Sequence, residues 1–169
     1  MRGTDQGDTL SFYYNTGNKN LYGINSITGH MYAECDVDWI TGSNTNSGSY
    51  IEVLEGGGGN DDIRSGDGED HIYGGAGQDY VEGGNHNDDI NGGPDGDWLN
   101  GGAGADVVEG QGGNDRICDE SVSSSPTLDE PGSYSGLACT ASGSSGDTLR
   151  GGDGNDRIYA YGGSDIIDA

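Results

Sequence analysis

A column of aspartates that recurs every nine residues is the feature that most restricts how this chain can fold. Aligned on nine, residues 56–118 give seven rows and residues 142–168 give three more, among them GGAGQDYVE and GGNHNDDIN. The sixth position is aspartate and the eighth is Ile, Leu or Val in all ten rows. Because a flexible glycine-rich linker needs no fixed apolar period, we interpret the rows as a structural repeat.

Each position of the repeat suggests a physical role. Glycine at positions one, two and four permits positive φ and a tight turn whose carbonyls point one way. Positions seven to nine predict a very short strand, with the eighth side chain inward and its two neighbours outward. The turn offers carboxylate and carbonyl oxygens, which suit the hard cation calcium, and it offers no nitrogen or sulfur ligands, so zinc and copper are not favoured.

The charge of the chain restricts its partners. Its 169 residues include 36 glycines, only 30% are hydrophobic, and the formal net charge is -24. Such a composition alone is typical of disorder, so folding requires something that neutralises the charge. Nucleic acid and anionic membranes would be repelled. No apolar run is long enough to cross a bilayer, and the first residues, MRGTDQGDTL, lack the apolar region of a signal peptide.

The nonapeptide resembles the repeat of the RTX family, the calcium-binding β-roll proteins, over nearly all of residues 47–118 and 142–168. The resemblance implies an all-β, right-handed parallel β-roll (a β-solenoid) with two repeats per coil and calcium between turns stacked on the same edge. In that family, one turn contributes the carbonyls of positions two and four and the aspartate at six. The turn one coil later contributes the carbonyls of positions one and three and its own aspartate.

Carried onto this chain, the resemblance implies two sets of metal ligands. The carboxylate ligands are Asp61, Asp70, Asp79, Asp88, Asp97, Asp106, Asp115, Asp147, Asp156 and Asp165. The carbonyl ligands are Gly57, Gly59, Gly66, Gly68, Gly74, Gly75, Ala76, Gly77, Gly83, Gly84, Asn85, His86, Gly92, Gly93, Pro94, Asp95, Gly101, Ala103, Gly110 and Gly112. His86, Asp95 and Ser145 depart from glycine at position four, which makes their turns less secure.

The implied cofactor is Ca²⁺, with about six to eight ions set against the net charge of -24. Without calcium, the aspartates of successive coils would be forced close together with nothing between them. We therefore expect the calcium-free chain to be largely unfolded, so that calcium binding and folding are one event.

An interruption separates the two blocks of repeats. Residues 119–141, rich in Ser, Pro and Gly, predict a loop insertion, and residues 142–169 continue the roll. Cys118 and Cys139 bracket the insertion. A disulfide between them would close its base, and two free thiols are the alternative. Cys35 is then the odd cysteine, either buried and inert or bonded to a partner chain.

The N-terminal part matches the repeat poorly. We interpret residues 1–46 as an irregular β segment, either a cap or a lateral docking part, with residues 3–11 in pattern. Residues 47–55 open the calcium-binding roll over 47–118 but carry Glu52 in the aspartate column. Neither end shows a polar cap, which solenoids normally need. Two readings follow: a slice of a longer protein, or copies that stack head to tail into a filament.

One outward column suggests a second surface. Asp62, Tyr80, Trp98 and Arg116 occupy position seven of every second row, so they predict an exposed aromatic ladder that ends beside a cation. Such a face could contact another subunit or a glycan. Simple stabilisation between neighbouring strands is the other interpretation.

The sequence predicts no enzyme, because neither HExxH nor GxSxG occurs and its three histidines form no site. We expect a bacterial calcium-binding structural protein, secreted or at the cell surface, that assembles with copies of itself into a filament, matrix or surface layer. One alternative is an RTX accessory or secretion module of a larger secreted enzyme or toxin. Another is a surface adhesin that binds glycans or another surface protein. Nucleic acid and membrane insertion are excluded as partners.

Overall fold

The structure, a computed structural model of the 169-residue chain, describes residues 20–21, 30–32, 39–41, 53–119, 139 and 144–169. The predictions about Cys35, Glu52 and residues 3–11 lie outside the described residues, as does most of the predicted insertion.

The described residues form fourteen strands. They are β1 (Asn20–Leu21), β2 (His30–Tyr32), β3 (Trp39–Thr41), β4 (Val53–Gly58), β5 (Asp62–Asp67), β6 (His71–Ala76), β7 (Tyr80–Asn85), β8 (Asp89–Pro94), β9 (Trp98–Ala103), β10 (Val107–Gly113), β11 (Arg116–Cys118), β12 (Thr148–Gly154), β13 (Arg157–Tyr159) and β14 (Ile166–Asp168).

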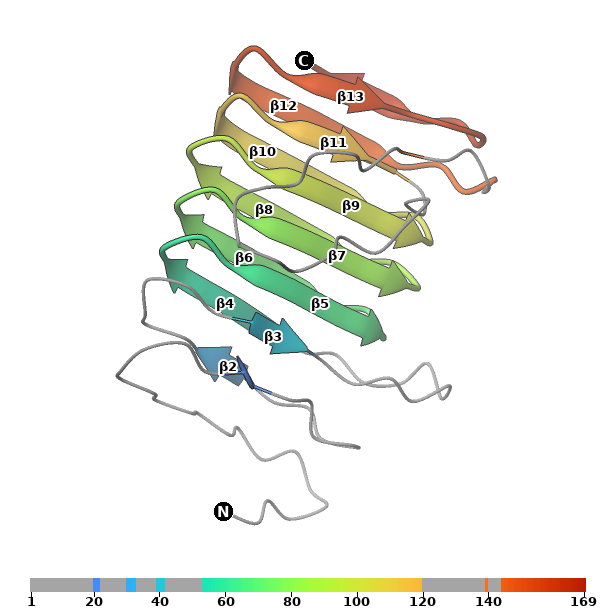
Figure 1. Cartoon of the computed structure of the whole chain (residues 1–169). Helices are drawn as coiled ribbons and strands as arrows, with labels where there is room; N and C mark the ends of the chain where they lie inside the picture. Colours follow the sequence, from blue (N-terminus) through green and yellow to red (C-terminus); the bar gives the residue numbers. More distant parts are fainter. Residues whose placement is uncertain (1–19, 22–29, 33–38, 42–52, 120–138, 140–143) are drawn as a thin grey trace.

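Odd-numbered and even-numbered strands form two separate seven-stranded sheets. All pairings are parallel, and each strand pairs with the strand two places along the chain. Trp98, for example, lies between Tyr80 of the preceding coil and Arg116 of the following coil. In Figure 1 the coils stack in chain order, from blue at the bottom to red at the top. The predicted all-β parallel solenoid, with two repeats per coil, is confirmed.

The core between the two sheets is one aliphatic side chain per strand. Every described member of the position-eight column from β4 to β12 is fully buried: Leu54, Ile63, Ile72, Val81, Ile90, Leu99, Val108, Ile117 and Leu149. Ile158 of β13 packs against this column and is partly buried. The predicted inward eighth position is therefore confirmed, and the core is only one side chain thick.

Most strands are longer than the repeat predicts. A strand confined to positions seven to nine is found in β11, β13 and β14, whereas β4 to β10 and β12 continue into the following glycines for six or seven residues. Gly66 pairs with Gly84, and Gly84 pairs with Gly102. Because parallel pairing uses only backbone groups, glycine continues the ladder without a side chain.

Glycine has two different roles in the turns. Positions two and four take positive φ, as at Gly75 (111°) and Gly77 (126°), which confirms two of the three predicted positions. Position one does not take positive φ. There, a Cβ on Gly74 would lie 2.5 Å from the carbonyl oxygen of Gly92 and 2.7 Å from Oδ2 of Asp79. Gly74 is thus required by the close approach of oxygen atoms rather than by its backbone conformation, whereas Ser65 and Ala160 carry a Cβ at position one of their rows.

His86 provides a test of this division, because it adopts φ 82° at position four. The left-handed conformation destabilises a non-glycine residue by roughly 1–3 kcal/mol. Replacing that residue with glycine removes the strain but costs roughly 0.5–1 kcal/mol, because glycine loses more backbone entropy on folding. We expect His86→Gly to stabilise the calcium-loaded protein by about 1 kcal/mol, read as a higher melting temperature by circular dichroism. His86→Ala, which keeps the strained φ, is the matched control. Equal melting temperatures for the glycine and alanine variants would contradict the argument.

The solenoid continues across the interruption. Val107 of β10 pairs with Thr148 of β12, and Arg116 of β11 pairs with Arg157 of β13, so each pairing spans the insertion. A disulfide joins Cys118 to Cys139, with the two Cα atoms 5.8 Å apart. The chain thus leaves one coil after Cys118 and re-enters the next coil in register.

The outer face of the odd-strand sheet differs from the prediction. Tyr80 and Trp98 are 0% and 6% exposed, so the expected exposed aromatic ladder is wrong. The two rings stack with centroids 5.5 Å apart, and the Arg116 guanidinium lies 5.3 Å from the Trp98 ring, which confirms the predicted cation beside the ladder. Tyr80 and Trp98 form a second small apolar cluster with Cys118, against which Cys139 and Tyr159 pack. The aromatic residues at position seven thus act as a surface on which other side chains pack.

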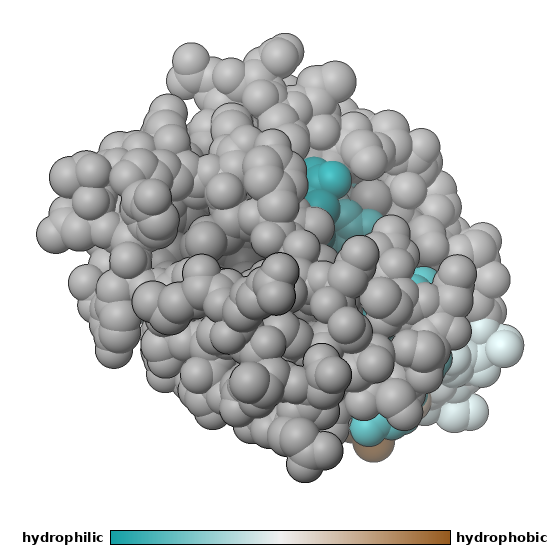
Figure 2. Space-filling view, turned by 90° about the horizontal axis from the view of Figure 1, so that it is seen from below, coloured by the Kyte–Doolittle hydropathy of each residue, from teal (hydrophilic) through white to brown (hydrophobic). Residues whose placement is uncertain are grey.

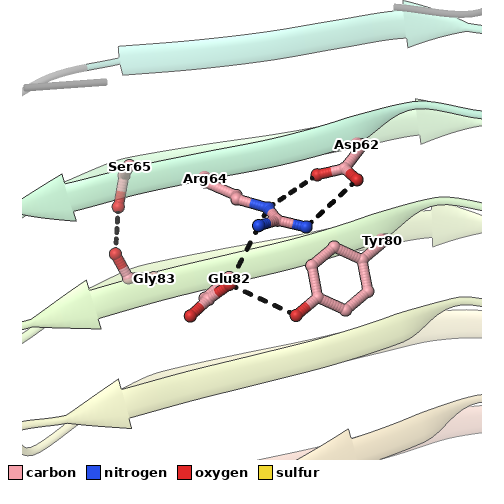
Figure 3. Close-up of polar contacts among 6 residues, drawn as sticks. All are labelled: Asp62, Arg64, Ser65, Tyr80, Glu82 and Gly83. Atoms are coloured by element: carbon pink, nitrogen blue, oxygen red, sulfur yellow. Dashed lines mark hydrogen bonds and ion pairs between the residues drawn. The ribbon is translucent and has the colours of Figure 1, made fainter. Parts of the chain in front are cut away.

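A polar network extends this outer face toward β5 (Figure 3). Arg64 Nε donates to Asp62 Oδ1 at 2.9 Å and lies 3.9 Å from Glu82 Oε2. The Tyr80 hydroxyl donates to Glu82 at 3.3 Å. In the view from below, the described residues that reach the surface are mostly teal or pale, the colours of hydrophilic and intermediate residues (Figure 2).

Candidate metal centre

The aspartates at position six form two ladders, one along each edge of the roll. Each ladder collects every second repeat, because two repeats make one coil. One ladder contains Asp61, Asp79, Asp97, Asp115 and Asp156, and the other contains Asp70, Asp88, Asp106, Asp147 and Asp165. All ten aspartates singled out in the sequence are thus brought next to a neighbour of the same ladder.

One oxygen of eight of the ten ladder carboxylates links neighbouring coils. Oδ1 of Asp97 accepts a hydrogen bond from the backbone N–H of Asp79 at 2.9 Å, and Oδ1 of Asp115 accepts one from the N–H of Asp97 at 2.8 Å. The bond also crosses the interruption, from the N–H of Asp106 to Oδ1 of Asp147 at 2.8 Å. This oxygen is engaged with backbone, so it orients the carboxylate.

The other oxygen points into a confined space lined by further oxygens. Oδ2 of Asp79, Asp88 and Asp97 is buried and has no hydrogen-bond partner. A Cβ placed on Gly83 would lie 2.6 Å from Oδ2 of Asp88 and 2.5 Å from the carbonyl oxygen of Gly101 in the next coil. Carboxylate and carbonyl oxygens from successive coils therefore line the same cradle, which is kept open by the glycine at position one.

Burial makes these carboxylates reluctant to ionise without a cation. It raises the pKa of Asp79 to about 6 and the pKa of both Asp88 and Asp97 to about 8. Neighbouring negative charges of the same ladder, such as Asp106 beside Asp88, add to the rise, whereas the backbone hydrogen bonds oppose it. A buried array of like charges is unfavourable unless a positive charge compensates it.

The donor set matches a hard divalent cation. The ladders offer carboxylate oxygens with unsatisfied lone pairs beside backbone carbonyls, which are the ligands that calcium takes. The ring nitrogens of His71 and His86 have other neighbours: His71 is exposed and faces Asp89 with 3.5 Å between Nδ1 and Oδ2, and His86 Nδ1 lies 2.8 Å from the Asn85 carbonyl oxygen. The residues of the ladders therefore fit calcium better than a metal that prefers nitrogen.

One buried carboxylate, that of Asp119, is not predicted by the repeat. Asp119 lies at 0% exposure beside Asp147 and Asp165, and these three carboxylates form a cluster with ligand atoms within 4.8 Å of one another. Asp119 falls outside the repeats, and only its place directly after Cys118, where position one of a next row would stand, could have drawn attention to it.

A shallow pocket also escaped the sequence analysis. It is lined by Asp67, Glu82, Asn85 and Asn100, among others, and Asn85 donates to Asp67 at 2.5 Å. These residues occupy positions three and nine, whose side chains vary from row to row, so the repeat predicts only the backbone carbonyl of Asn85 as a ligand and no pocket.

Two buried carboxylate ladders on a parallel β-solenoid define a class of protein, the calcium-binding β-roll. A family model for the RTX calcium-binding nonapeptide repeat matches this chain in four copies, over residues 46–81, 82–117 and 142–169. The chain belongs to this RTX family, and it is a calcium-binding β-roll protein. No curated protein and no solved structure matches it.

Among the described residues, the structure contains no helix that is long and apolar enough to cross a membrane.

Proposed function

We propose that this protein is an extracellular structural module whose β-roll folds only when calcium occupies the aspartate ladders. The observation that carries the proposal is the row of buried Oδ2 atoms without hydrogen-bond partners, as at Asp79, Asp88 and Asp97. Each lies beside carbonyl oxygens of the next coil. Folding the chain without a cation would bury these oxygens uncompensated, whereas calcium would convert the same oxygens into ligands.

Each calcium ion would lie between two neighbours of one ladder. One site would use the carbonyls of Gly75 and Gly77 with Asp79, and the carbonyls of Gly92 and Pro94 with Asp97, as the family pattern implies. Hydrogen bonds link eight such neighbouring pairs, two of them across the interruption. These eight pairs support the upper end of the expected range of six to eight ions.

Counting bound calcium by native mass spectrometry of the full chain tests this arrangement. An interior aspartate such as Asp97 belongs to two pairs, so Asp97→Asn is expected to lower the number of tightly bound ions by about two. Asp89→Asn removes one exposed carboxylate from neighbouring β8 and is expected to leave the number unchanged. An equal loss of ions in both variants would show that net charge, and not the ladder, holds calcium.

The proposed organisation follows the predicted division of the chain. Residues 47–118 and 142–169 form the calcium-binding roll, residues 119–141 form an insertion closed by the Cys118–Cys139 disulfide, and residues 1–46 serve as a cap or docking part. Strands β1, β2 and β3 pair in line with the two sheets, which supports a cap that extends the solenoid. Millimolar calcium and an oxidising environment are found outside the cell, which supports a secreted or cell-surface location.

Head-to-tail assembly is a second proposed function, supported by the exposed strand β14. Ile166 and Ile167 are 65% and 53% exposed there, although Ile167 occupies the column that is buried in each strand from β4 to β12. A second copy of this chain stacked on β14 would cover both side chains and pair with its outer edge. In a longer polypeptide, as in the accessory-module alternative, a further coil would cover them instead.

Analytical ultracentrifugation and negative-stain microscopy of the calcium-loaded chain test assembly. We expect filaments or a ladder of oligomers, and we expect Ile166→Lys to reduce them by adding charge to the exposed edge strand. His71→Lys, at the same position of interior strand β6, is the matched control. Monodisperse monomers with and without calcium would contradict assembly and leave calcium binding untouched.

The glycan-binding alternative loses its support, because Tyr80 and Trp98 are buried.

A further inference from the structure

Asp119 occupies the place of a position-one glycine. It directly follows Cys118, the last residue of β11, and keeps the spacing of the coil: its N–H donates to the Tyr159 carbonyl at 3.3 Å, and its carbonyl accepts from the Gly102 N–H at 3.1 Å. The backbone of the roll therefore continues through Asp119. In this coil, however, a carboxylate replaces the hydrogen atom of glycine.

The slot at position one faces the aspartate ladder. At the position-one glycines of other coils a Cβ would meet the carboxylate of the same repeat, as at Gly101, where it would lie 2.6 Å from Oδ2 of Asp106. The side chain of Asp119 consequently reaches the ladder. Its ligand oxygen and those of Asp147 and Asp165 all lie within 4.8 Å of one another. Three carboxylates meet where the repeat alone would place two.

The cluster contains buried oxygens that have no protein partner. Asp119 is 0% exposed and Asp147 is 1% exposed, and neither Asp119 Oδ1 nor Asp147 Oδ2 has a hydrogen-bond partner. The second oxygen of Asp119 accepts from the N–H of Tyr161, and Asp165 Oδ1 accepts from the N–H of Asp147 at 3.2 Å. These backbone bonds orient two of the carboxylates, so that the remaining oxygens are left for a ligand.

The electrostatics of the cluster favour a cation. Burial raises the pKa of Asp119 to about 6, and the negative charges of Asp147 and Asp165 contribute to this rise. A third carboxylate brought beside the buried Asp147 and the partly buried Asp165 destabilises the site unless a positive charge is bound there. All the unpartnered atoms are hard oxygens, which favours calcium over a soft metal.

We propose that Asp119, a residue outside the repeats, joins Asp147 and Asp165 as a third carboxylate ligand of one calcium ion. The inference rests on the proposed calcium-binding function and adds to it one specific ligand. Because Asp119 adjoins the Cys118–Cys139 disulfide, the ion would fasten the base of the insertion to the roll.

Calcium titration of the full chain by isothermal titration calorimetry, with native mass spectrometry to count the ions, tests the proposal. In Asp119→Asn we expect one ion to bind about tenfold more weakly or to be lost, because calcium affinity follows the number of charged ligands. Asp119→Gly introduces the residue found at position one of most other rows and is expected to fold in the same register, so the same loss is expected there. Asp153→Asn removes an exposed carboxylate from neighbouring β12 and is expected to bind like the wild type.

The outcomes separate this proposal from the one on which it rests. If both Asp119 variants bind calcium as the wild type does, Asp119 is not a ligand. The proposal that the roll binds calcium would still stand. Tighter calcium binding in Asp119→Gly would also overturn the proposed role of Asp119, because its carboxylate would then weaken calcium binding. A wild-type chain that binds no calcium would refute the proposed function itself. Weakening by both variants, without weakening by Asp153→Asn, supports the third ligand.

Discussion

Removing calcium with a chelator is expected to convert the roll from β-sheet into a largely disordered chain at neutral pH. The core contributes one aliphatic side chain per strand, which is a small apolar reserve for a protein of this size. Against it stand two ladders of buried carboxylates whose Oδ2 atoms, as at Asp88 and Asp97, have no hydrogen-bond partner. Without calcium, the folded state would therefore keep the unfavourable burial and mutual repulsion of these carboxylates and lose the positive charge that compensates them.

The size of the effect follows from linkage. A ligand that binds only the folded state at about 100 times its dissociation constant stabilises that state by about 2.7 kcal/mol. Two such ions already match the lower end of the stability of an ordinary domain, about 5 kcal/mol. With several ions involved, their removal is expected to unfold the roll and not merely to lower its melting temperature.

Far-UV circular dichroism during a calcium titration of the chelated chain measures this transition. We expect a cooperative gain of β signal, and we expect no comparable gain with the same concentration of magnesium, which demands a smaller octahedral site and gives up its water reluctantly. Sodium chloride at matched ionic strength controls for screening of the net charge of -24. A chelated chain that kept the β spectrum would contradict calcium-dependent folding.

Most of the fold can be predicted from the sequence, because two columns of the repeat, one apolar and one of aspartates, indicate the same coil. Both columns keep their spacing, so the two sheets, the two-repeat coil and the inward eighth position follow from the pattern alone. The position-one glycines were misjudged for a physical reason. A sequence shows that glycine recurs, but it does not show whether the backbone conformation or a nearby oxygen, such as that of Asp79 beside Gly74, requires it.

The repeat does not predict the contacts of residues at its variable positions or of residues outside it. Tyr80 and Trp98 were placed outward correctly, yet an outward direction becomes exposure only if nothing packs on that face. Asp119 lies in a stretch without period, and its approach to Asp147 depends on how the chain leaves and re-enters the roll. Periodicity fixes contacts within the solenoid, whereas contacts made by its irregular segments depend on tertiary packing.

The calcium-free and calcium-loaded proteins are expected to respond to pH in opposite directions. Burial raises the pKa of Asp79 to about 6 and that of Asp88 and Asp97 to about 8, above the ordinary value of 3.8. A raised pKa in the folded state means that folding favours the protonated carboxyl. Stability from these groups is therefore fully present below about pH 4 and is lost as pH rises through 6 to 8.

In the calcium-free chain, acidification from pH 8 to 5 is thus expected to recover part of the β signal. In the calcium-loaded chain, protons compete with calcium for the same oxygens, so the calcium midpoint is expected to rise by roughly tenfold or more over the same interval. Exposed carboxylates titrate near pH 4, below this interval, so the change isolates the buried ladders.

Circular dichroism at fixed ionic strength, with and without chelator, measures both responses. The charges that act on Asp88 are Asp106, Asp70 and Glu69, all acidic, so none of them reverses the direction of its pKa. His71 faces exposed Asp89, so His71→Gln is the control that removes the imidazole beside this carboxylate. A calcium midpoint that stayed constant from pH 8 to 5 in this variant would mean that ions bind without displacing protons, and the carboxylate ladders would then not be the calcium ligands.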